Sequence, residues 1–277
     1  MRSSNPVLSR PDAFTPQQQP TQYQQYGQPP QGQFGYQQPG QPYPGQPYPQ
    51  DPVPGVQGTM TIDDVITKSA ITMGTLIATA ALTFMFMPQR FLFPAVIVSA
   101  IVGFITVMVV AARRVIKPGA VLAYAAIEGI FIGAISKVYE YAWNGIVPAA
   151  IMATLVTAAA TLGAYKFFRI KVTNKFRKMV MIGTLAYAGL LLVNFILSMF
   201  GMGFLFSGGN LAVLLLISAI GVGLAVFNLI LDFDYIEQGI AMGAPASESW
   251  RGAFGLTVTM VWLYIEMLRL LSYFRSN

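Results

Sequence analysis

Residues 210–231 read NLAVLLLISAIGVGLAVFNLIL, a run that contains no charged side chain. Hydrocarbon about 30 Å thick requires roughly 20 helical residues to cross it, so this run is long enough to span a bilayer. Similar runs precede and follow it, and the series of seven extends from Ile71 to Tyr273. The sequence therefore predicts an all-α membrane protein, a seven-helix transmembrane bundle. The predicted spans are residues 70–87, 91–112, 120–138, 147–165, 179–201, 210–231 and 252–274.

The composition agrees with a membrane protein and argues against an enzyme. Hydrophobic residues make up 55% of the 277 residues and charged residues only 10%, which is unusual for a soluble domain. The chain has no cysteine and no histidine. Thiolate chemistry, histidine bases and metal sites that use Cys or His ligands are therefore excluded. We expect no enzymatic activity, no cofactor and no nucleic-acid partner.

The N-terminal region differs in composition from the rest of the chain. Residues 1–60 hold 13 of the 18 prolines, many glutamines and tyrosines, and few aliphatic residues. Such a segment buries too little apolar surface to offset the entropy of ordering. We predict a disordered cytoplasmic tail over residues 1–60 and a transmembrane domain over residues 61–277. The tail is either a solvated tether or a recruitment segment for a membrane-protein partner.

Basic residues between the predicted spans indicate the orientation of the chain, because Lys and Arg collect in cytoplasmic loops. The loops after the second and fourth spans are the basic ones. We therefore predict a multi-pass protein of the cell membrane with a cytoplasmic N-terminus and an external C-terminus. The basic residues are Arg113, Arg114 and Lys117 in the first of these loops, and Lys166, Arg169, Lys171, Lys175, Arg177 and Lys178 in the second.

A few ionisable residues lie at or near membrane depth, where they mark functional sites by default. Glu128 is in the middle of the third span. It is either a protonated carboxyl bonded to backbone or a vestibule group that orients a cation. Asp232 and Asp234 end the sixth span and, two residues apart, face roughly opposite sides of a helix.

Glu266 in the last span has two alternative interpretations. Arg269 follows at i+3 on the same face, and a local ion pair would neutralise the carboxylate. Alternatively, Glu266 meets an aspartate of the sixth span inside the bundle. Two such carboxyls share a proton and titrate as a coupled unit. When ionised, they offer the oxygen ligands that Ca²⁺ prefers.

Two segments resemble the Bax inhibitor-1 / YccA family, also called the transmembrane BAX inhibitor motif family. They are Leu231-Asp232-Phe233-Asp234 and the run LYIEMLRLL at residues 263–271. The resemblance covers roughly residues 60–275 and is similar to a bacterial, actinobacterial-type branch. It implies a seven-helix bundle with a central last helix.

The family resemblance also implies an activity, that of a monomeric, pH-sensitive Ca²⁺ leak channel. The gating pair carried over by position is Asp232 and Glu266, which would also bind the permeant Ca²⁺ transiently. Asp234, Glu128 and Arg269 are secondary candidates. Some bacterial members interact with a membrane protease, so the alternative is a regulatory membrane protein without transport. The expected partners are the lipid bilayer, Ca²⁺ and protons.

The depths of the two carboxyls in the predicted spans differ by roughly 13 Å at the helical rise per residue. A contact between Asp232 and Glu266 therefore requires an irregular start of the last span. Pro245 and Ser247 resemble a helix start well before the apolar run. We expect residues 247–254 to lie along the membrane surface, which would bring the carboxyls to one level.

Overall fold

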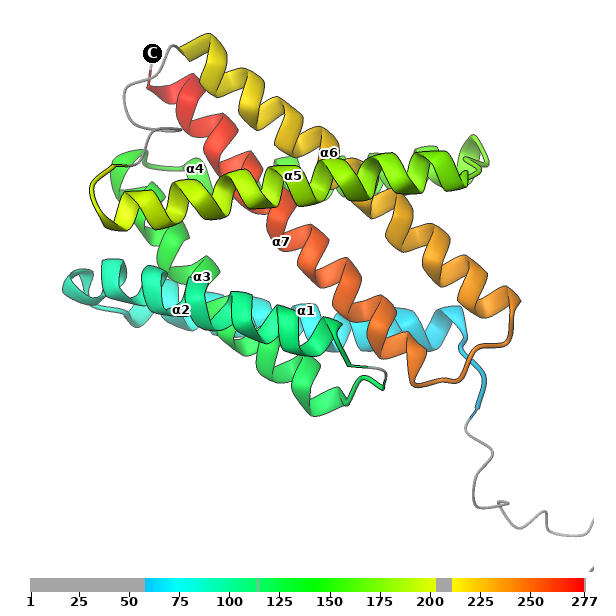
Figure 1. Ribbon diagram of the computed structural model, residues 1–277. Helices are drawn as coiled ribbons and strands as arrows, with labels where there is room; N and C mark the ends of the chain where they lie inside the picture. Colours follow the sequence, from blue (N-terminus) through cyan, green and yellow to red (C-terminus); the bar gives the residue numbers. More distant parts are fainter. Residues whose placement is uncertain (1–57, 114, 203–210, 277) are drawn as a thin grey trace, which may run out of the picture. The chain divides into compact units, whose positions relative to one another are not determined.

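The computed structural model describes residues 58–113, 115–202 and 211–276. The predicted disorder of residues 1–57 and the basic residue Arg114 lie outside these ranges. Seven helices in the described part are long and apolar enough to cross a membrane (Figure 1), which confirms the predicted fold class. They are α1 (Ile62–Phe86), α2 (Gln89–Ala111), α3 (Pro118–Ala142), α4 (Ile146–Phe167), α5 (Asn174–Met199), α6 (Leu211–Ala241) and α7 (Glu248–Arg275).

The start of α1 follows from local sequence. The Thr61 side chain accepts a hydrogen bond from the backbone N–H of Asp64 at 3.2 Å. Asp63 and Asp64 lie in the first turn, where negative charge interacts favourably with the helix dipole. Thr61 is therefore the N-cap of α1, which begins before the predicted span of residues 70–87.

The packed part of the chain begins slightly before this cap. Residues 58–60, which the sequence assigns to the tail, lie against the turn between α6 and α7. The N–H of Met60 donates to the carbonyl of Ala244 and the N–H of Ala246 donates to that of Gly58, both at 2.7 Å. Lys68 of α1 also donates to the Ala246 carbonyl, at 2.8 Å. The turn between the last two helices is therefore held to the beginning of α1.

The end of α6 differs most from its predicted bound, and the start of α1 lies before the predicted span of residues 70–87. α6 continues through Asp232 and Asp234 to Ala241, and α7 begins at Glu248. The 31 residues of α6 give a length of about 46 Å, which exceeds the hydrocarbon thickness of about 30 Å. Gly243, with a φ of 63°, lies in the turn that follows. The expectation that residues 247–254 lie along the membrane surface is wrong, because residues 248–254 form the first turns of a continuous α7.

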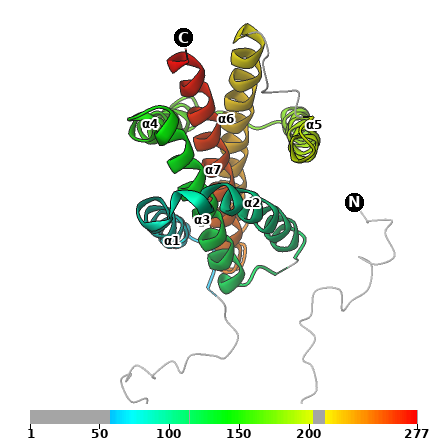
Figure 2. The same ribbon diagram turned by 90° about the vertical axis from the view of Figure 1, so that its left-hand side faces the viewer.

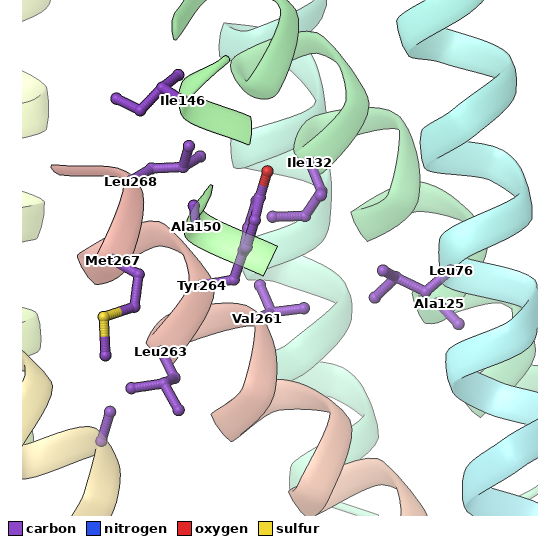
Figure 3. Packing of buried hydrophobic residues seen from close by; sticks show 11 residues of the cluster. Leu76, Ala125, Ile132, Ile146, Ala150, Val261, Leu263, Tyr264, Met267 and Leu268 are labelled. Carbon is purple, nitrogen blue, oxygen red and sulfur yellow. The ribbon is translucent and has the colours of Figure 1, made fainter. Parts of the chain in front are cut away.

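α7 is the central helix of the described domain. It packs against α1, α3, α4 and α6, whereas the α5 backbone lies close to that of α6 alone among the described helices. Figure 2 shows α5 apart from the others, on the outer side of α6. Tyr264 of α7 extends towards Ile132 of α3 within the largest apolar cluster (Figure 3). The central position of α7 agrees with the one implied by the family resemblance.

Two glycines of α3 allow its close approach to α1. A Cβ atom on Gly129 would lie 2.5 Å from the carbonyl oxygen of Leu76. A Cβ atom on Gly133 would overlap the carbonyl oxygen of Ala80. Small residues four apart let membrane helices pack backbone to backbone. This G-x-x-x-G pair is therefore a packing site within the chain.

Candidate functional site

Glu266 is completely buried on the face of α7 that meets α6. Its carboxylate accepts two hydrogen bonds from Nη1 of Arg269, one to each oxygen and both at 3.1 Å. The hydroxyl of Tyr187 donates to Oε1 at 3.0 Å, and the indole N–H of Trp262 donates to the same oxygen at 3.3 Å. The structure therefore contains the local ion pair that i, i+3 spacing predicts, and it adds two neutral donors.

A glycine of α6 provides the space for this carboxylate. A Cβ atom on Gly221 would lie 2.6 Å from Cδ of Glu266 and 2.5 Å from the Tyr187 hydroxyl. The rings of Tyr187 and Trp262 also stack, with their centroids 5.9 Å apart. The sequence analysis did not identify Gly221, Tyr187 or Trp262. Only the proximity of Trp262 to Glu266, at i−4, was visible in the sequence.

Asp232 is on the same helix interface but meets a different part of α7. It accepts a hydrogen bond from the hydroxyl of Thr259 at 2.6 Å. A Cβ atom on Gly255 would lie 3.0 Å from its Oδ1. Each of the two carboxyls thus faces the opposite helix where that helix carries a glycine, with Asp232 against Gly255 and Glu266 against Gly221.

The structure does not bring Asp232 and Glu266 into contact. Thr259, the partner of Asp232, precedes Glu266 by two helical turns, which is about 10 Å along α7. Gly221, which faces Glu266, precedes Asp232 by three turns, or about 16 Å along α6. The short turn between two long antiparallel helices sets these levels. The two carboxyls therefore lie at two separate levels of one interface. The contact between Asp232 and Glu266 that the sequence analysis expected is not formed.

Asp234 faces away from α7, towards the beginning of α5. Its Oδ2 accepts hydrogen bonds from Arg177 and Gln238, both at 2.7 Å. Asp232 and Asp234 therefore lie on different faces of α6, as their spacing predicts, and Asp232 is the one that meets α7.

The contact between Arg177 and Asp234 is a partly solvated ion pair, because the Arg177 side chain is 42% exposed. Pairs of this kind contribute little to stability. We expect Arg177→Gln to lower the free energy of unfolding by about 1 kcal/mol or less. Thermal unfolding in detergent, with Lys175→Gln as the control for loss of one positive charge, checks this. A much larger loss of unfolding free energy would show that this ion pair is a major contribution to the stability of the fold.

α5 meets α6 and α7 through polar side chains along one of its faces. Besides Arg177 and Tyr187, its Thr184 accepts a hydrogen bond from Asn228 of α6 at 2.7 Å. Helices in membranes associate through hydrogen bonds of this kind, each of modest strength. We call the contacts of Arg177, Thr184 and Tyr187 the α5 seam. Since the α5 backbone lies close only to that of α6 among the described helices, these side-chain contacts are a large part of what positions α5.

Glu128 is separate from the other candidate residues. It is on α3, and its Oε2 lies 2.7 Å from the position of a Cβ atom on Gly103 of α2. No described residue donates a hydrogen bond to it. Its role as a vestibule carboxylate stays a prediction. Among the described residues, no three acidic side chains come together as a metal site would require.

Comparison with known proteins adds one finding. The model of a family described as "Bax inhibitor 1 like" matches residues 5–276 of the chain. No curated protein matches the chain. The match starts at residue 5 and so includes most of the N-terminal region, which the resemblance seen in the sequence, covering roughly residues 60–275, leaves out.

Proposed function

Because the chain belongs to the Bax inhibitor 1-like family, we propose that it is a pH-sensitive passive leak channel for Ca²⁺, gated by the carboxyls of Asp232 and Glu266. The observation that best supports this proposal is the placement of both carboxyls on the α6–α7 interface. Carboxylates inside a membrane bundle are rare and commonly mark ion pathways. No residue is assigned a catalytic role.

Arg269 is the element that closes the proposed pathway. Its guanidinium occupies both oxygens of Glu266, which are the oxygens that a passing cation would use. A cation can interact with Glu266 only after Arg269 moves or is displaced. The Tyr187 hydroxyl contacts both groups, at 3.0 Å from Glu266 and 3.3 Å from Arg269. Movement of α5 along its polar seam would therefore loosen the closed arrangement.

Protons reduce the flux in this mechanism. A protonated Glu266 no longer offers a charged ligand to Ca²⁺, and the nearby positive charge of Arg269 then repels the cation. A protonated Asp232 also loses its attraction for the cation at the second level. Flux is therefore expected to fall as the pH falls, and to recover when the carboxyls ionise again.

The proposed orientation places the N-terminus in the cytoplasm and the C-terminus outside the cell. Two contacts support the part of this proposal that groups the basic loops on one side of the domain. Arg251 of α7 donates to the carbonyl of Arg113 after α2, at 3.3 Å. Arg177 after α4 pairs with Asp234 near the end of α6. The basic loops thus lie on the same side as the α6–α7 turn, and residues 58–60 pair with that turn.

Ca²⁺ flux in liposomes that contain the purified full chain tests the proposal. We expect Asp232→Asn to lower the flux and flatten its pH dependence, because it removes one charged level. Asp234→Asn is the matched control, since it makes the same chemical change on a different face of α6. The double variant Glu266→Gln/Arg269→Gln removes the other level without leaving a single buried charge. Unchanged flux and pH dependence in both Asp232→Asn and the double variant would reject the carboxylate mechanism.

The second candidate is a regulatory membrane protein that modulates a membrane protease or assembly machinery without transport. The family match over residues 5–57 supports it, because this N-terminal region is part of the shared family pattern. Residues 58–60, which follow that region in the sequence, are hydrogen-bonded to the α6–α7 turn. Absence of Ca²⁺ flux through the intact protein at any pH would favour this candidate.

A further inference from the structure

A cleft of about 440 Å³ opens between α1 and α4, with α3 and α7 as its floor. Its walls are almost entirely apolar, and its volume is in the range of small-molecule binding sites. The hydroxyls of Ser136 and Tyr264 form a hydrogen bond with each other at 2.7 Å. Those of Thr154 and Thr257 donate to carbonyls of their own helices, so none of the four requires a polar ligand. The lining includes Ile77, Phe84 and Met85 of α1, Leu155 of α4, and Met260 and Tyr264 of α7.

The mouth of this cleft faces the hydrocarbon of the bilayer. α1 and α4 both cross the membrane and do not pack against each other. Side chains at the mouth are strongly exposed in the isolated chain, with Ile77 at 63%, Met85 at 68% and Leu155 at 53%. At membrane depth such side chains contact lipid. An apolar cavity is not filled stably by water, so its occupant must itself be apolar.

We propose that the cleft is a binding site for one acyl chain of a bilayer phospholipid. The chain enters laterally between α1 and α4 and packs against α7. Its packing is favourable because it replaces an empty volume with van der Waals contacts to the lining side chains. A phospholipid is the apolar molecule that the bilayer itself presents at this opening.

The proposed lipid and the carboxyls of the candidate site lie on opposite faces of α7. Thr257, Met260, Val261 and Tyr264 line the cleft, and their spacing of three and four residues places them on one face of α7. Thr259 and Glu266, each two residues after a lining residue, point roughly the opposite way. The central helix thus has a lipid face and a carboxyl face. This inference does not depend on Ca²⁺ transport.

The test uses the full chain in vesicles of phosphatidylcholine that carries a photoreactive diazirine on one acyl chain. After illumination, mass spectrometry locates the lipid adducts. We expect adducts on Met260, at the floor of the cleft, as well as on Leu185, a 67% exposed residue of α5 that contacts bulk lipid. Labelling of Leu185 without labelling of Met260 would overturn the proposal.

Two tryptophan substitutions on α1 form a matched pair. Ala81 lines the cleft, whereas Ala78 is exposed on α1 outside it. We expect Ala81→Trp to abolish labelling of Met260 and to leave labelling of Leu185 unchanged, while Ala78→Trp changes neither. Equal labelling of Met260 in both variants would contradict the proposed site.

Discussion

Glu266→Gln is expected to lower the free energy of unfolding by about 3 to 5 kcal/mol, the usual cost of breaking a buried ion pair by removing one partner. The Glu266 side chain is completely buried and that of Arg269 is 13% exposed. The substitution keeps the shape of the side chain but removes the negative charge that balances the guanidinium at membrane depth. Thermal unfolding in detergent, followed by tryptophan fluorescence, measures the effect.

Two further variants separate the charge effect from other causes. Glu237→Gln makes the same chemical change at an exposed position of α6 and is expected to shift stability by about 0.5 kcal/mol or less. Glu266→Gln/Arg269→Gln removes both charges and is expected to restore much of the loss. Wild-type stability in Glu266→Gln would show that the ion pair within α7 does not stabilise the fold, and Arg269 could then not be the closing element.

Gly133→Ala is expected to lower the free energy of unfolding by about 1 to 3 kcal/mol, because overpacking forces a well-packed interface apart. The new methyl group would overlap the carbonyl oxygen of Ala80, and a backbone atom cannot rotate away as the end of a side chain can. α1 and α3 would have to separate. The same unfolding measurement detects the loss.

Gly163→Ala on α4 is the matched control for this prediction. No atom lies within 4 Å of a Cβ placed on Gly163, so the methyl group meets no obstacle. Alanine also favours helix over glycine by up to about 1 kcal/mol. We expect unchanged or slightly increased stability. Equal losses in both variants would mean that glycine is required for a reason other than the approach of α1.

Local sequence explains the start of α1, although the predicted apolar span begins only at residue 70, whereas the end of α6 lies well beyond the predicted span. The start of α1 depends on Thr61 and the acidic residues beside it, all within one turn. The end of α6 depends on distant groups instead. Asp232 and Asp234 lie within the continued helix, and Thr259 and Arg177 provide hydrogen-bond partners for their carboxyls.

Some contacts of the candidate site can likewise be predicted from local sequence, whereas others depend on the packing of separate helices. The ion pair of Glu266 and Arg269 is visible in the sequence, since residues three apart share a helix face. Tyr187 is 79 residues away from Glu266 in the chain, and no local pattern connects them. The pairing of Asp232 with Thr259 similarly requires the register between α6 and α7, which the short turn and the unbroken α7 set.

The amino-acid sequence by itself determined that the chain crosses a membrane in seven helices and which ionisable groups lie within the spans. These properties follow from the length and polarity of single segments, because hydrocarbon accepts only apolar stretches with internally bonded backbones. Tertiary structure alone decided which groups meet. The levels of Asp232 and Glu266, the approach of Gly133 to Ala80 and the cleft between α1 and α4 depend on how separate helices pack, and small residues far apart in the chain set that packing.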